Sequence, residues 1–198
     1  KFILLARNEQ IIDFGLTVNN KKPDEYSHNL ICVESDLAFQ PGSMVEIPKG
    51  IIRSNMYQSG EIGWLDSESS IRINKPGDME FRFTLPDKID YTELSISTES
   101  YIPLYVKYNM RDNQGQIEIM ENKYEYYLYN AKTRLWDQID ASVTISENVD
   151  NYIGYGSEVL MRISVVEMGT PDFSSSRPVN YESELLSMPE ISVKGVAK

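Results

Sequence analysis

The chain has 198 residues, with 30 acidic and 19 basic side chains, and its formal net charge is −11 at pH 7. This charge argues against a nucleic-acid interface, which needs clustered Lys and Arg side chains, and it opposes docking on anionic lipid. No apolar run approaches the roughly eighteen residues of a membrane span, and the length suffices for one sizeable core without disulfides.

Extended apolar runs alternate with polar turns in the first part of the chain. We expect strands over 11–18 and 26–33, each bounded by turn residues. A short strand over Met44–Ile47 should stop at Pro48, because proline cannot donate a hydrogen bond to a neighbouring strand.

The segment around residue 80 contains one of the clearest strands. Ile71 and Ile73 share one face of a first strand, and residues 75–78 form a turn. Side chains then alternate strictly, which is typical of a half-buried strand. The face predicted to point inward carries Met79, Phe81, Phe83 and Leu85.

The next two patterned runs predict a hairpin. Residues 102–110 alternate, residues 111–115 form a turn in which Gly115 adopts the positive φ that such turns need, and Gln116–Met120 returns antiparallel.

Residues 124–166 carry the strongest pattern. The sequence predicts two strands whose inner faces carry Tyr124, Tyr126 and Leu128 and then Val159, Met161, Ile163 and Val165. Between them, Trp136 resumes the extended pattern after a polar turn, and we expect its indole in the core.

Apolar residues nowhere recur at helical spacing over eleven or more positions, so the sequence predicts an all-β fold, an antiparallel β-sandwich or jelly roll with short irregular termini. Residues 1–59 are either the first strands of this sandwich or a small separate β unit, and residues 60–168 are its core. Residues 169–198 are expected to be a loop-rich tail packed on the sandwich, with a helical turn over 181–186 and a short strand near Ile191.

The aromatic strand ending in YNAKTRLWDQI (129–139), followed by GSEVLMRISV (156–165), resembles the last hairpin of galactose-binding-like jelly-roll domains. Such domains occur among carbohydrate-binding modules and in accessory regions of bacterial surface proteins. The resemblance covers Tyr126–Val165 in detail. It implies a core position for Trp136, ligand contacts in loops, and a structural calcium ion held by loop oxygens.

Residues suited to catalysis are sparse. The single histidine, His28, has no surrounding motif, and Cys32 lies in an apolar setting typical of a buried thiol. Asp66 and Glu68 are the carboxylates that most resemble a pair, but their surroundings read as a loop with solvated charges. We therefore expect no enzymatic activity, and we assign Asp66 and Glu68 to the calcium ion that the resemblance implies.

Sugar binding is the leading hypothesis for a site. Saccharide rings stack on aromatic side chains while neighbouring polar groups hold their hydroxyls. Trp64 follows a glycine before a polar loop, whereas Asn151, Tyr152 and Tyr155 occupy a loop in the region that resembles jelly-roll ligand loops. The alternative is that these aromatic residues cap the sandwich edge or contact another protein.

We expect a non-catalytic, extracytoplasmic binding or spacer module of a larger bacterial envelope protein, located at the cell surface or outside it. Polysaccharide is the expected partner, and the alternative is a structural or interaction domain that contacts another envelope protein. No nucleic acid and no direct membrane insertion are expected, and any signal or anchor should lie outside this segment.

Overall fold

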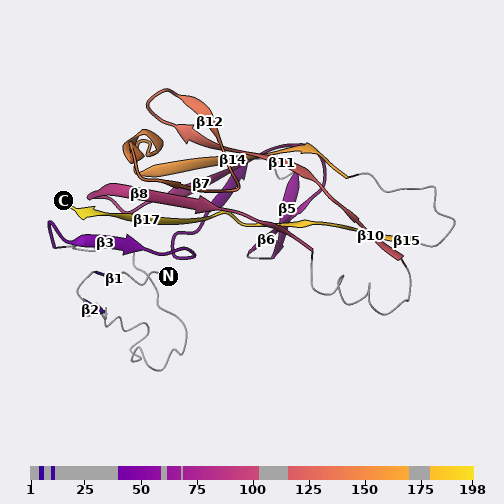
Figure 1. The fold of residues 1–198 in the computed structure, drawn as a ribbon, viewed down its shortest axis with the longest axis horizontal. Helices are drawn as coiled ribbons and strands as arrows, with labels where there is room; N and C mark the ends of the chain where they lie inside the picture. The colour runs from indigo at the N-terminus through magenta and orange to yellow at the C-terminus, as the bar shows by residue number, and fades with distance from the viewer. Residues whose placement is uncertain are drawn as a thin grey trace.

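The structure is a computed structural model that describes residues 5–6, 10–11, 40–58, 62–67, 69–102, 116–169 and 179–198. The strands predicted over 11–18, 26–33 and 102–110 lie wholly or largely outside these ranges, as do His28 and Cys32. The described chain is all-β, with three antiparallel sheets and one parallel pair of strands (Figure 1).

The five-stranded sheet, here called sheet C, is the upper layer of Figure 1. Its strands, in spatial order, are β12 (Leu135–Ile139), β11 (Lys123–Asn130), β14 (Glu158–Glu167), β7 (Gly77–Thr84) and β4 (Asn55–Gln58). All of these pairings are antiparallel.

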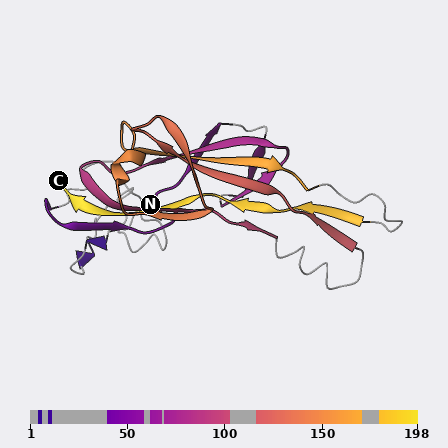
Figure 2. The same cartoon turned by 45° about the horizontal axis from the view of Figure 1, so that its top comes forward.

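Two sheets form the opposite layer. Sheet A consists of β13 (Ser142–Ile145), β8 (Ile89–Ser97), β17 (Glu190–Ala197), β3 (Met44–Ile47), β1 (Leu5–Ala6) and β2 (Gln10–Ile11). Sheet D consists of β5 (Gly63–Ser67), β6 (Ser70–Ile73), β16 (Leu185–Ser187) and β9 (Ser100–Tyr101). A parallel pair, β10 (Gln116–Met120) and β15 (Val179–Ser183), extends from the far end (Figure 2).

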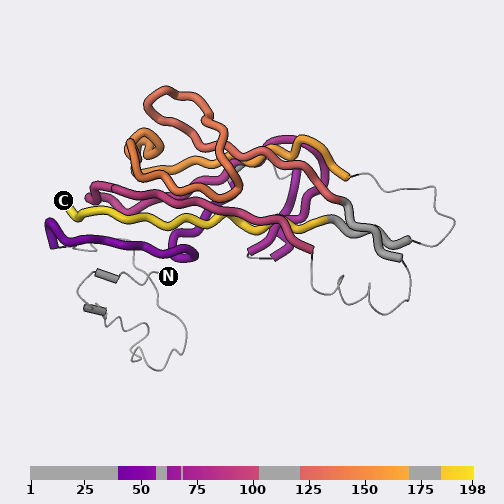
Figure 3. The backbone as a smooth tube through the Cα atoms, in the orientation of Figure 1, coloured from indigo at the N-terminus to yellow at the C-terminus, as the bar shows by residue number. Residues whose placement is uncertain are grey.

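Sheets A and D are continuous along the chain, because β9 follows β8 and β17 follows β16 after two residues each. At this junction the hydroxyl of Thr98 donates to the carbonyl of Ser187 at 2.8 Å. The two sheets therefore behave as one bent layer. The path of the tube in Figure 3 shows β17 running between β8 and β3.

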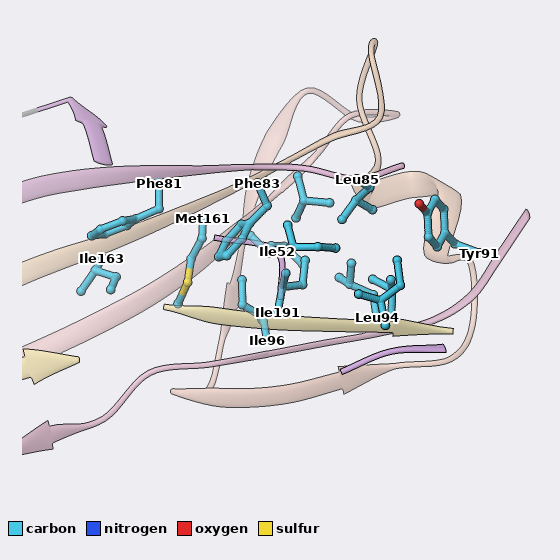
Figure 4. Packing of buried hydrophobic residues seen from close by; sticks show 14 of the residues in the cluster. Ile52, Phe81, Phe83, Leu85, Tyr91, Leu94, Ile96, Met161, Ile163 and Ile191 are labelled. Carbon is cyan, nitrogen blue, oxygen red and sulfur yellow. The ribbon is translucent and has the colours of Figure 1, made fainter. Parts of the chain in front are cut away.

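The core fills the space between sheet C and this bent layer (Figure 4). β7 and β14 contribute from one side, and β8 and β17 contribute from the other. Their fully buried side chains include Met79, Phe81, Phe83, Met161, Ile163, Leu94, Ile96 and Ile191. The inward face predicted for residues 79–85 and the apolar face predicted for 159–165 are confirmed.

The core position predicted for Trp136 is wrong. β12 pairs with β11 so that Trp136 lies opposite Tyr129, and Leu128, the neighbour of Tyr129, is fully buried on the inner face. Because side chains alternate across a strand, Tyr129 and Trp136 share the outer face of sheet C. The indole is half-buried there and packs under the guanidinium of Arg162.

The C-terminal segment also differs from expectation. Residues 181–186 form parts of β15 and β16 instead of a helical turn. The strand expected near Ile191 is confirmed and is longer than expected, because it is part of β17, an inner strand of sheet A. Alternation over 190–197 buries Ile191 and Val193, which explains the strand. β10 pairs in parallel with β15, and the turn and most of the partner strand expected to form an antiparallel hairpin with it lie outside the described residues.

Candidate functional site

Trp64 occupies β5, an edge strand of sheet D, and its side chain is 46% exposed. Leu65, the next residue of β5, is 54% exposed, so the direction of the Trp64 side chain is taken from the neighbouring strands β6 and β16. Ile71 and Leu186, on the row that Leu65 begins, are fully buried against the core. Trp64 therefore points to the opposite face of the sheet, as the sequence predicted for an exposed indole.

Strand pairing aligns Trp64 with three further residues. Trp64 lies opposite Arg72, Arg72 lies opposite Leu185, and Leu185 lies opposite Tyr101. We call these four residues the Trp64 row. Its two ends are exposed aromatic side chains at the two edges of the sheet, since Tyr101 is 38% exposed, while Leu185 in its interior is buried.

Asp66 belongs to the same surface through an irregularity in β5. The register between β5 and β6 shifts between Leu65 and Ser67, so Asp66 is the extra residue of a β-bulge, a device that redirects a side chain. Its carboxylate accepts a hydrogen bond from Nε of Arg72 at 3.0 Å, which makes a charged pair beside Trp64. Bulk solvent reaches both partners, with side-chain exposures of 22% for Arg72 and 33% for Asp66.

The calcium assignment stays a prediction. Glu68 lies outside the described residues, and the Asp66 carboxylate pairs with the Arg72 guanidinium. Within the described part of the chain, no three His, Cys, Asp or Glu side chains are grouped so as to hold a metal ion.

The other predicted site residues gather elsewhere, around the 3₁₀ helix η2 (Val149–Tyr152), which packs against β8 and β11. The hydroxyl of Tyr152 donates to Asp137 at 3.0 Å, and the Asn151 carbonyl accepts from the Ala131 amide at 2.6 Å. Burial, followed by the Asp137 carboxylate, raises the pKa of Tyr152. Tyr155 is fully exposed in the next loop.

These contacts give Asn151 and Tyr152 a structural role. Asn130 also donates to Asp137 at 2.9 Å, and its side-chain oxygen accepts from the amides of Lys132 and Thr133. The η2 segment therefore holds the β11–β12 turn in place. The strand order separates this segment from Trp64, because η2 packs on β8 and β11 whereas Trp64 lies on the edge of sheet D.

A second group of interacting side chains lies on the outer face of sheet C. Arg162 donates to Glu80 through Nε at 3.0 Å and Nη2 at 2.5 Å, and its guanidinium carbon lies 4.2 Å from the centre of the Trp136 ring. Trp136 meets Tyr129 edge-on at 5.2 Å between centroids. Tyr127 completes this group, which we call the Trp136 cluster, by donating to Glu125 at 2.5 Å.

Sequence reasoning identified Trp64 but not its partners. Arg72 lies on β6, the direct neighbour of β5, whereas Tyr101 lies on β9, which joins these two strands only through β16. The alternation of Ile71, Arg72 and Ile73 indicated that the Arg72 side chain lies on the outer face of its strand, but no local signal connected Arg72 with Tyr101.

Within the described ranges no helix combines the length and apolar character that a membrane crossing requires.

Comparisons with curated proteins and with solved structures return no match to this chain. A family profile matches residues 46–195, which is more than half of the chain and runs from β3 into β17. Both the Trp64 row and the Trp136 cluster fall inside the matched segment. The chain therefore belongs to the family described as Domain of unknown function (DUF8815).

Proposed function

We propose that the protein is a non-catalytic binding module that binds polysaccharide on the Trp64 row. The observation that carries this proposal is the alignment of two exposed aromatic side chains, Trp64 and Tyr101, at opposite edges of one sheet, with the Arg72–Asp66 pair between and beside them. Aromatic faces bind the apolar face of a sugar ring, and charged groups hold its hydroxyls.

This proposal places the module outside the cytoplasm, as part of a larger bacterial envelope protein, and makes it a relative of the galactose-binding-like jelly rolls. The antiparallel sandwich supports that kinship at the level of architecture. The acidic chain suits a module that stays dispersed next to other macromolecules.

The test is a titration of the protein with a panel of polysaccharides, followed by tryptophan fluorescence. The protein has two indoles, so a Trp136→Phe background isolates the emission of Trp64. We expect a saturable change with at least one polysaccharide, and we expect Trp64→Ala or Tyr101→Ala to weaken binding by about tenfold, the loss of one stacking contact. Leu135→Ala, which removes an exposed apolar side chain at the start of β12, is the matched control.

A second function has its own supporting observation. The Trp136 cluster combines Trp, Tyr and Arg side chains on the outer face of sheet C, the residue types enriched where proteins meet. We therefore keep an interaction domain that contacts another envelope protein as the alternative. It is favoured over the first function if no polysaccharide alters Trp64 emission and a purified envelope protein alters that of Trp136.

A further inference from the structure

One edge of sheet C is formed by β12, a five-residue strand that pairs with β11 alone among the described strands (Figure 1). Its register with β11 runs without a shift, and it contains neither proline nor lysine, which are common means of protecting an edge. Leu135, at its start, is 64% exposed. β12 therefore presents a regular, partly apolar edge to which a further strand can add.

The other edges of the three antiparallel sheets are less suited to strand addition. β4 and β5 each pair with an irregular register, and β2 and β9 have two residues each. β13 is regular, but it has four residues, and its exposed side chains are those of Ser142 and Thr144. Among these described edges, β12 alone combines regular pairing with an exposed large apolar side chain.

The Trp136 indole does not cover this edge. Its two ring contacts are Arg162 and Tyr129, which come from β14 and β11. Both of these strands lie on the inner side of β12 in the strand order of sheet C. The indole is therefore held over the sheet and directed away from its border.

The sequence around β12 is complementary to itself when one copy is reversed. In an antiparallel pair centred on Asp137, Leu135 lies opposite Ile139 of the second copy, and two-fold symmetry repeats this contact. The same register brings Arg134, directly before the strand, next to Asp140, directly after it. Both of these side chains are exposed, and neither forms an ion pair within the described part of the chain.

The unfavourable position in this register is Asp137, because it meets Asp137 of the second copy. Its carboxylate accepts hydrogen bonds from Asn130 at 2.9 Å and from Tyr152 at 3.0 Å, which hold it towards its own subunit. One pair of like charges thus opposes two apolar pairs and two pairs of opposite charges, each of comparable strength. The balance favours association.

Other registers fit less well. A shift of two residues in one direction places Leu135 opposite Asp137, and a shift in the other direction places Ile139 there. Either shift also separates Arg134 from Asp140, and a shift of one residue reverses the faces of the strand.

From these observations we infer that two copies of this chain associate by antiparallel pairing of their β12 strands about a two-fold axis, which joins the two copies of sheet C into one continuous sheet. The occupant of the β12 edge is thus a second copy of the same chain. This inference goes beyond polysaccharide binding and does not depend on it, because the Trp64 row lies on sheet D.

Sedimentation velocity of the 198-residue chain at increasing concentrations tests the association. One five-residue strand from each copy makes a smaller contact than that of stable complexes, so we expect a reversible dimer with a dissociation constant on the order of 100 μM. Each copy carries a charge of −11, so the buffer contains about 0.15 M salt, which limits the range of the repulsion to about 8 Å. A chain that stays monomeric up to about 1 mM overturns the inference.

A substitution at the edge tests whether the dimer uses β12. We expect Leu135→Lys to raise the dissociation constant at least about tenfold, because a charge on an edge strand opposes strand addition. Val166→Lys is the matched control, since Val166 is 53% exposed on β14, an inner strand of the same sheet, and the change in net charge is the same. Circular dichroism checks that both variants are folded. Equal effects of the two substitutions overturn the inference.

Exchange of the terminal charges tests the register. We expect Arg134→Asp and Asp140→Arg each to raise the dissociation constant about tenfold, because each replaces two attractive contacts with two repulsive ones. Asp140→Arg makes the net charge less negative, so a weaker dimer in this variant cannot result from general repulsion. The double substitution should restore the dimer, and an equimolar mixture of the two single variants should form a heterodimer. Single variants that dimerise as tightly as the unsubstituted chain, or a mixture without a heterodimer, overturn the inference.

Discussion

Tyr124, the second residue of β11 in sheet C, interacts electrostatically with Glu184, the residue directly before β16. Burial is the larger cause that raises its pKa to about 12, the Glu184 carboxylate adds to the rise, and the Asn122 amide, which donates to the phenolic oxygen at 3.0 Å, opposes it. Glu184 in turn accepts from the Asn122 backbone amide at 3.2 Å. The phenol is thus neutral in the folded protein at a pH where a free tyrosine begins to ionise.

The sign of the pH dependence follows from this shift. Because the pKa is higher in the folded than in the unfolded state, the contribution of Tyr124 to stability is complete below about pH 10 and is lost as pH rises towards about 12. We expect the free energy of unfolding to fall over this window and Tyr124→Phe to make the fall shallower. Urea unfolding at pH 8, 10 and 11 measures it. An unchanged slope in the variant would show that Tyr124 does not titrate as described.

At the scale of single elements, Gly77 at the start of β7 lies close to Ile62, the residue directly before β5. Its φ is +142°, a region almost restricted to glycine, and a Cβ there would overlap Cδ1 of Ile62. We expect Gly77→Ala to destabilise the protein by about 3 kcal/mol, the sum of backbone strain and overpacking. Denaturant unfolding of the variant measures the loss.

Two controls separate the causes of that loss. Gly42 also has a positive φ, +84°, but a Cβ there meets nothing within 4 Å, so Gly42→Ala should cost only about 1 to 2 kcal/mol of strain. Ile62→Val removes the overlapping methyl, so Gly77→Ala should cost about 1 kcal/mol less in that background. Strictly additive effects would rule out the contact between Gly77 and Ile62 as a cause.

The elements differ in how well the sequence predicts which face of the sheet their side chains occupy. Alternation in β7 and β14 predicted which side chains enter the core, because that pattern depends only on neighbours within one strand. Trp136 was misplaced because its face depends on the register of the β11–β12 hairpin, which the Asn130 turn decides. Trp64 was found from its polar surroundings, but Tyr101 reaches it only through non-consecutive strands, and single-strand patterns do not contain that pairing.

At the scale of the whole molecule, the last strand is the one that closes the bent layer. β17 pairs with β8 on one side and β3 on the other, and it buries Ile191, Val193 and Ala197. By contrast, the described residues before residue 40 add only β1 and β2, at the outer edge of sheet A. We therefore expect the described core to depend more on β17 than on residues 1–39.

Deleting each end in turn tests this asymmetry. Removal of residues 190–198 takes away an inner strand and part of the core. Its cost should exceed a typical total stability of about 5 to 15 kcal/mol, so we expect no cooperative unfolding transition. Removal of residues 1–39 should leave a single cooperative transition and unchanged near-ultraviolet circular dichroism of Trp64 and Trp136, because the β3–β17 and β4–β7 pairings remain. Loss of that transition in the second deletion would make residues 1–39 an integral part of the sandwich, and its retention would locate the folding unit within residues 40–198.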